Sequence, residues 1–85
     1  IGPSDLSISL GCKPSFDELE PKAEQAVAHI LGRSRHHGVV AAIHNGTPES
    51  ALRRIQQGFQ LVTISSDARL MTAGAQQVIA KMRAR

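Results

Sequence analysis

Apolar residues recur every three or four positions between residues 21 and 37, a spacing that predicts an amphipathic α-helix. Ser15 and Glu18 have the spacing of a capping box ahead of this segment, and Pro21 suits a first helical turn because its missing N–H would be unpaired there. Gly38 is the expected stop. The predicted apolar face consists of Ala23, Ala26, Val27, Ile30 and Leu31.

Two short apolar segments, residues 38–43 and 59–64, predict β-strands. The first is a continuous apolar run between turn residues, which favours a strand buried on both faces and therefore a parallel sheet. Thr47 as N-cap and Pro48 as first residue predict a helix between the two strands, ending at Gly58. The side chains expected to face inward from this helix are Ala51, Leu52 and Ile55.

A last helix is predicted after the turn and capping residues Ser65, Ser66 and Asp67. Strands and helices therefore alternate, with connections of a few residues, as in βα units with right-handed crossovers. The sequence predicts an α/β fold built from such units. The expected apolar face of the last helix consists of Leu70, Met71, Gly74, Val78 and Met82.

Two architectures fit this order of elements. A doubly wound sheet needs more strands, and so does a (β/α)8 barrel of about 250 residues, of which this chain would supply about the last three units. No Gly-x-Gly-x-x-Gly is present, so a dinucleotide-binding sheet has no support. Because the sequence lacks an initiator Met, we expect residues 1–85 to be the C-terminal part of one longer domain. In a barrel, the strand ends at Ser4–Asp5, His44–Asn45 and Ser65–Ser66 would converge on one mouth.

Composition argues against two classes of partner. The net charge is +3, but the basic residues are spread along the chain and no Trp or Tyr is present to stack on bases. No apolar run approaches the about 18 residues that a membrane span needs. The lone Cys12 cannot form an internal disulfide. We therefore expect a cytoplasmic protein that binds neither nucleic acid nor membrane.

Asp5 is the first candidate for chemistry, because it follows a Gly-Pro turn at a predicted strand end. A hard cation such as Mg²⁺ takes oxygen ligands, typically one or two carboxylates with water or substrate at the other positions. One Asp at a strand end is half of such a set. The alternative, which spacing alone favours, is that Asp5 caps a short helical turn through residues 6–8.

Residues Gly2–Ser7 read Gly-Pro-Ser-Asp-Leu-Ser and are followed by Leu10-Gly11. They resemble the Gly-Pro-x-Asp-Leu-Ser motif of the HpcH/HpaI aldolase and citrate lyase family, the metal-dependent (class II) 2-oxo-acid aldolases. The resemblance continues in order through Ile43–Gly46, Gly58–Phe59 and Leu61–Asp67, and so spans nearly the whole chain. Pro3 favours the aldolase branch over relatives such as the citrate lyase β-chain. The implied fold is the C-terminal part of a (β/α)8 TIM barrel.

The resemblance implies a carbon–carbon lyase that cleaves a 4-hydroxy-2-oxo acid to pyruvate, or a close 2-oxo acid, plus an aldehyde. Substrates of this kind include 4-hydroxy-2-oxoheptanedioate and 2-dehydro-3-deoxyglucarate. Asp5 would be one of two acidic ligands of a divalent cation, Mg²⁺ or otherwise Mn²⁺ or Co²⁺, which stabilises the enolate. The backbone around Ser4, with Gly2 and Pro3, would contact the substrate carboxylate, and His44 the aldehyde portion.

Other parts of the family's site match nothing in this chain. The second metal ligand (Glu), an Arg beside the enolate oxygen and a His base come from earlier strands, so we expect no catalytic residue within residues 1–85 and no activity from them alone. The resemblance also implies a homo-oligomer, with the terminal helix at a subunit interface, although that helix can equally close its own barrel. The rival hypothesis is a small α/β binding or assembly module without catalysis, in which Asp5 is only a cap.

The remaining polar candidates have structural interpretations. His44 can simply hydrogen-bond the loop that follows it. His36 and His37 are adjacent and cannot form the i, i+4 pair that binds zinc, so we expect them to complement the helix dipole. Asp67 is expected to be an N-cap and not a second metal ligand. Ser65 and Ser66 can offer hydroxyl or N–H groups to an anion.

Overall fold

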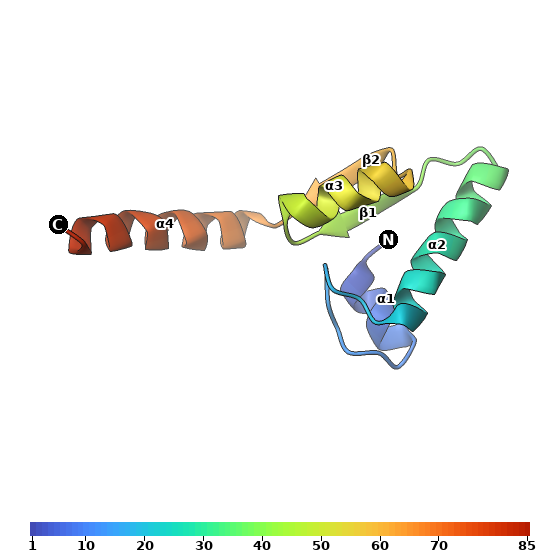
Figure 1. The fold of residues 1–85 in the computed structure, drawn as a ribbon, viewed down its shortest axis with the longest axis horizontal. Coiled ribbons are helices and arrows are strands. Elements are labelled where there is room, and N and C mark those ends of the chain that lie inside the picture. The colour runs from blue at the N-terminus through green and yellow to red at the C-terminus, as the bar shows by residue number, and fades with distance from the viewer.

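The computed structural model describes all 85 residues, as four helices and two strands. The two strands pair in parallel, with Ala42 opposite Leu61 and Asn45 opposite Ile64, and a helix forms the crossover between them (Figure 1). The predicted α/β class with a parallel βα unit is confirmed, whereas closure into a barrel requires strands beyond these two. In chain order the elements are α1 (Pro3–Ser9), α2 (Pro21–His36), β1 (Ala42–Asn45), α3 (Pro48–Gln57), β2 (Leu61–Ile64) and α4 (Asp67–Arg83).

Helix α2 lies where the apolar spacing predicted it and ends as expected. Gly38 has a φ of 68°, and Val39 N donates to Ser34 O over 2.8 Å, which closes a Schellman motif. Its start differs from the prediction. The N-cap is Glu20, which makes no side-chain cap bond, and the Ser15 hydroxyl accepts from Glu18 N within the preceding loop. The capping-box interpretation is wrong, because this bond closes a turn ahead of the helix.

The strands are shorter than predicted. Val39 and Val40 are 60% and 61% exposed and lie outside β1. The observed strand, Ala42–Asn45, therefore begins and ends later in the chain than the predicted strand over residues 38–43. Burial alternates along β1, since Ile43 and Asn45 are buried while Ala42 and His44 are half-buried. The prediction of a strand buried on both faces is therefore wrong. On the covered face, Ile43 joins a core with Val27, Leu31 and Phe59, and Phe59 precedes β2 instead of starting it.

The first residues combine a strand-like contact with a helix. Ile1 N donates to Ala42 O over 2.7 Å, and Ile1 O accepts from His44 N over 3.1 Å, which is the bonding pattern of a parallel strand beside β1. Helix α1 then begins at Pro3, with Gly2 as N-cap. The sequence predicts a strand end at Ser4–Asp5, but only Ile1 makes strand-like hydrogen bonds. Asp5 lies inside the first turn and is not the N-cap, which corrects the capping alternative.

Helix α3 buries a different face from the one predicted. Thr47 caps it by accepting from Ser50 N over 3.2 Å, and Pro48 is its first residue, both as expected. Of the predicted inward residues only Ala51 is buried, whereas Leu52 and Ile55 are 60% and 50% exposed. The helix buries polar side chains in their place, namely Ser50 and Arg54.

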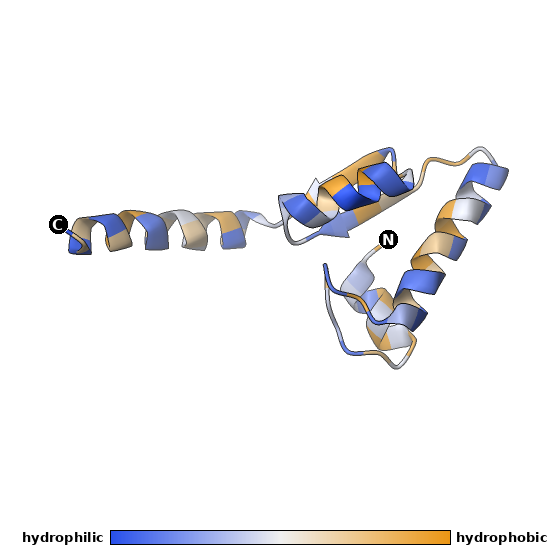
Figure 2. Cartoon of the chain, in the orientation of Figure 1, coloured by the Kyte–Doolittle hydropathy of each residue, from blue (hydrophilic) through white to orange (hydrophobic).

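Helix α4 extends away from the rest of the chain and packs against none of the other elements (Figure 1). Its N-cap is Ser66, which accepts from Arg69 N over 3.2 Å, so the expectation that Asp67 is the cap is wrong by one residue. Apolar and polar residues share its surface along its length (Figure 2). Its predicted apolar face exists but is exposed, including Leu70, Met71, Val78 and Met82. None of the four helices is both long and apolar enough to span a bilayer.

Candidate functional site

The carboxyl ends of three neighbouring segments lie at one edge of the sheet. Ile1 is bonded to β1 through His44 N, and Ser65 N donates to Asn45 O over 2.8 Å on the other side of β1. Three backbone segments are therefore adjacent at this edge. They lead into the turn at Gly2–Asp5, contain His44, and lead into the start of α4, respectively. The three predicted segments are thus neighbours, whereas their convergence on a barrel mouth stays a prediction.

Asp5 offers a free carboxylate at this edge. It is exposed and forms no ion pair with any Lys or Arg of the chain. The first helical bond of α1 runs from Leu6 N to Gly2 O over 2.9 Å, so the N–H groups of Ser4 and Asp5 have no partner within the helix. Pro3 is buried and Ser4 half-buried. These residues can supply one hard oxygen ligand and two N–H donors for a carboxylate.

The chain does not hold a complete set of metal ligands. Nowhere do three or more His, Cys, Asp or Glu side chains come together in a group that could hold an ion. Asp5 fits a cation such as Mg²⁺ as a single carboxylate ligand, because such an ion takes only one or two carboxylates. No second carboxylate joins Asp5 in such a group.

His44 is held on the uncovered face of the sheet. A hydrogen bond of 2.8 Å joins its Nδ1 to Oγ1 of Thr63, the residue opposite it in the β1–β2 register. The Phe16 ring lies against its ring, with centroids 5.4 Å apart and an interplanar angle of 79°. The alternative in which His44 bonds the following loop is not realised, because its partner is a strand residue. Its Nε2 makes no hydrogen bond within the chain.

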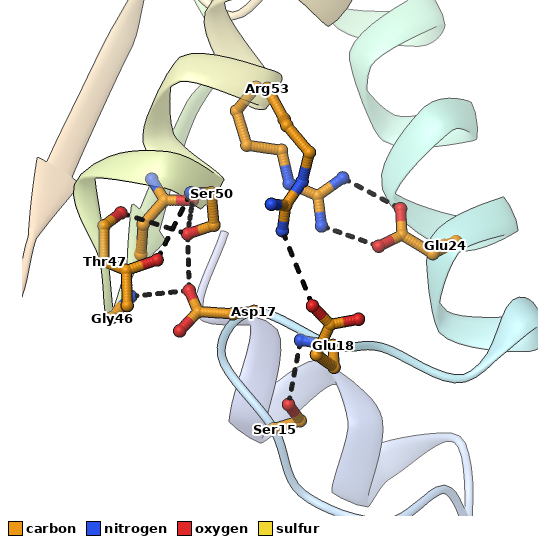
Figure 3. Close-up of polar contacts among 10 residues, drawn as sticks. Ser15, Asp17, Glu18, Glu24, Gly46, Thr47, Ser50 and Arg53 are labelled. Carbon is orange, nitrogen blue, oxygen red and sulfur yellow. Dashed lines mark hydrogen bonds and ion pairs between the residues drawn. The ribbon is translucent and has the colours of Figure 1, made fainter.

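Phe16 belongs to the loop between α1 and α2, which Asp17 fastens to the start of α3 (Figure 3). Asp17 Oδ1 accepts from Gly46 N over 2.9 Å and from the Ser50 hydroxyl. A Cβ at Gly46 would lie 2.6 Å from Asp17 Oδ2, so no other residue fits there without moving the carboxylate. We call Asp17, Gly46 and Ser50 the loop latch.

The latch stabilises the charged form of Asp17. Burial alone would raise the pKa of this carboxyl, but hydrogen bonds from Ser50, Gly46 N and Thr47 N, together with the Arg53 charge, hold the pKa below its ordinary value of 3.8. A carboxylate with a lowered pKa in the folded state stabilises the fold above its unfolded pKa of about 3.9, and this contribution is lost as the pH falls through the folded pKa.

We expect Asp17→Asn to lower the free energy of unfolding of the full-length protein by about 1–2 kcal/mol at pH 7, because an amide accepts these hydrogen bonds more weakly than a carboxylate. The difference from wild type should begin to shrink as the pH falls below the unfolded pKa of about 3.9, and should disappear below the lower folded pKa, where the carboxyl is protonated in both states. Urea denaturation at pH 7 and pH 3 measures both.

Glu18→Gln is the matched control. The Glu18 side chain is 93% exposed and lies 4.0 Å from Arg53, so its charge should contribute little. Equal stability of Asp17→Asn and Glu18→Gln at pH 7 would contradict the latch.

The other polar candidates lie at helix ends, in turns or on the surface. His36 ends α2 and His37 is its C-cap, bonded through Nε2 to Arg33 over 2.9 Å, which agrees with a role at the helix end. His29 is exposed, and Cys12 is a free, half-buried thiol. Ser65 adopts a positive φ of 62° at the turn into α4.

Sequence reasoning missed Phe16, Asp17, Ser50 and Thr63. A signal existed for Thr63, because alternation along two strands in register places it on the same face as His44. No local signal connects Asp17 with Gly46, which lies 29 positions further along the chain.

No family model matches the chain. Individual curated proteins do match it. It is 37% identical over 84 residues to a hydroxypyruvate/pyruvate aldolase of Rhizorhabdus wittichii, covering 99% of this chain and 34% of that protein. It is 30% identical over 78 residues to a 5-keto-4-deoxy-D-glucarate aldolase of Salmonella arizonae, covering 92% of this chain and 30% of that protein. A protein of the same name in Salmonella newport matches to the same extent.

The chain thus spans about a third of the length of the curated relatives it matches. The matches cover nearly every residue of the chain, including the motif at Gly2–Ser7 and both strand ends. At the level of the family, the names of these relatives support a lyase of the aldolase type. Over nearly its whole length the chain is similar to curated aldolases, in agreement with the resemblance of Gly2–Ser7 to the motif of the HpcH/HpaI aldolase family.

Proposed function

We propose that the protein containing this chain is a divalent-metal-dependent, pyruvate-type aldolase. It would cleave a 4-hydroxy-2-oxo acid to pyruvate, or a close 2-oxo acid, plus an aldehyde, and would form the same bond in reverse. The observation that carries this proposal is the pairing of Ile1 with β1, which brings the Gly2–Asp5 turn and His44 to one edge of the sheet. In a barrel the carboxyl edge of the strands is where the active site lies.

Within this proposal, each residue of the chain has a limited role. Asp5 is one carboxylate ligand of the cation, and Ser4 N–H, with Gly2 and Pro3 shaping the turn, faces the carboxylate of the 2-oxo acid. Two N–H groups without helical partners, beside a free carboxylate, support this assignment. His44 contacts the aldehyde portion, supported by its unbonded Nε2 on the uncovered face.

The cation, when bound, supplies the positive charge that stabilises the enolate as the carbon–carbon bond breaks. We propose Mg²⁺, with Mn²⁺ or Co²⁺ as substitutes, because the one ligand that this chain offers is a carboxylate oxygen. The remaining acidic ligand, the Arg beside the enolate oxygen and the His base would come from residues outside this chain.

Two further features complete the proposal. The exposed apolar residues of α4 support a homo-oligomer, since an uncovered apolar face of this kind favours contact with another surface. The free thiol of Cys12 is compatible with a reducing, cytoplasmic location. We propose no nucleic-acid or membrane partner.

Metal removal tests the central claim. We expect the full-length protein to exchange the C3 protons of pyruvate for deuterium in D₂O, as followed by proton NMR, because exchange requires the enolate but no aldehyde. Treatment with a chelator should lower the rate by about 10³-fold, and addition of Mg²⁺, Mn²⁺ or Co²⁺ should restore it. Exchange that continues unchanged in protein shown by elemental analysis to be metal-free would rule out metal dependence.

A further inference from the structure

Two contacts from different elements immobilise the ring of His44. Thr63, across the strand pair, bonds Nδ1 over 2.8 Å, and Phe16 packs edge-to-face at 5.4 Å. The Thr63 bond joins the two strands at a fixed register, because His44 and Thr63 are opposite each other in the ladder. With Nδ1 engaged, Nε2 is the ring nitrogen left for a ligand.

Phe16 is itself held from two directions. The adjacent Asp17 fastens the loop to Gly46 and Ser50, and the Arg69 guanidinium lies 5.5 Å from the centroid of the Phe16 ring. The loop, β1, β2 and the first turn of α4 thus all contribute to one row of side chains, Thr63, His44, Phe16 and Arg69. This row begins at the strand ends and continues onto the first turn of α4.

We propose that Thr63 is a positioning residue for the aldehyde half of the reaction. In this proposal its hydroxyl donates to Nδ1 of His44, which holds the ring in one orientation and leaves the proton on Nε2. Nε2–H then donates to the oxygen at C4 of the substrate, which becomes the aldehyde oxygen on cleavage. The inference rests on the proposed function, in which His44 contacts the aldehyde portion. It adds a residue without which His44 would sample several ring orientations.

Thr63→Val tests this in the full-length protein. Valine keeps the β-branched shape, and Thr63 is exposed, so the strand should persist without the hydroxyl. We expect the KM for the aldehyde in the synthetic direction to rise about five- to tenfold, with a smaller change in kcat. Thr63→Ser should restore the wild-type KM, and Thr72→Val, on the exposed surface of α4, should behave as wild type.

A double-mutant cycle shows whether Thr63 acts through His44. In a His44→Ala background, Thr63→Val should have no further effect on the KM for the aldehyde, since the group that it positions is gone. Additive effects of the two changes, or an unchanged KM in Thr63→Val, would overturn the proposal.

A measurement on the ring itself keeps the inference separate from the aldolase proposal. In protein labelled with ¹⁵N-histidine, the His44 signals, assigned with His44→Gln, should show one dominant tautomer in wild type and in Thr63→Ser. A mixture of tautomers is expected in Thr63→Val. The same His44 signals in wild type and Thr63→Val would refute the positioning role, even if aldolase activity is present. If the tautomer changes as expected in Thr63→Val but the wild-type protein shows no pyruvate exchange, the aldolase function is refuted and the positioning role is not.

Discussion

Replacing Asp5 by alanine in the full-length protein is expected to lower metal-dependent exchange of the pyruvate C3 protons by about 10³-fold or more. Under the proposed function, the physical reason would be the loss of one of two carboxylate ligands, which would weaken binding of the cation whose charge stabilises the enolate by several kcal/mol. Asp5 is exposed and makes no ion pair, so the fold should lose little stability. Exchange rates at several Mg²⁺ concentrations, with metal content by elemental analysis, measure the effect.

The matched control is Asp67→Ala. Like Asp5, Asp67 is an exposed carboxylate in the first turn of a helix, and its Oδ1 accepts only from the neighbouring Ala68 N. We expect exchange within about twofold of wild type for this variant, because surface changes away from a site have small effects. Unchanged exchange in Asp5→Ala, with Mg²⁺ affinity also unchanged, would exclude Asp5 as a ligand.

Local sequence signals predicted helices α2, α3 and α4 well, but they missed α1 as a full helix and predicted the strands less well. Helix α2 required only the three- and four-residue apolar spacing and a glycine stop, both of which depend on neighbours within a turn or two. The strand before Asn45 was placed too early, because Val39 and Val40 look like a buried run although they precede the paired segment. Apolar character alone does not report where a strand finds its partner.

The candidate site also contains parts that local sequence predicts and parts that it does not. The motif at Gly2–Ser7 and the strand ends could be read from short stretches of sequence. The latch at Asp17 and the ring of His44 held by Thr63 and Phe16 depend on residues 19 to 33 positions apart in the chain. Helix α3 shows why the hydrophobic pattern did not predict its buried face. Arg54 is buried, but a charged residue is expected at the surface unless its carboxylate partner on α2 is known.

Arg54→Ala is expected to lower the free energy of unfolding by about 3 kcal/mol. The Arg54 side chain is 8% exposed. It makes two hydrogen bonds of 2.8 Å to the Glu24 carboxylate, which is labelled in Figure 3, and so joins α3 to α2. It also donates to Gln57 Oε1 over 3.0 Å. Arg53→Ala is the control: its 4.0 Å contact with Glu18 is exposed, and its removal should cost less than about 0.5 kcal/mol. Denaturant titration of the full-length protein compares the two.

The unequal burial of the two partners predicts which half of the pair is harder to lose. Removing Arg54 leaves a Glu24 side chain that is 40% exposed and can be hydrated, whereas Glu24→Ala leaves a guanidinium that is almost fully enclosed. Glu24→Ala should therefore destabilise the protein at least as much as Arg54→Ala, although it removes the smaller side chain. Replacing both residues, Arg54→Met with Glu24→Leu, should recover most of the loss, because apolar pairs of similar volume often match a buried ion pair. If the double replacement is as unstable as the sum of the single changes, apolar packing cannot replace the pair, and its charges and hydrogen bonds themselves stabilise the fold.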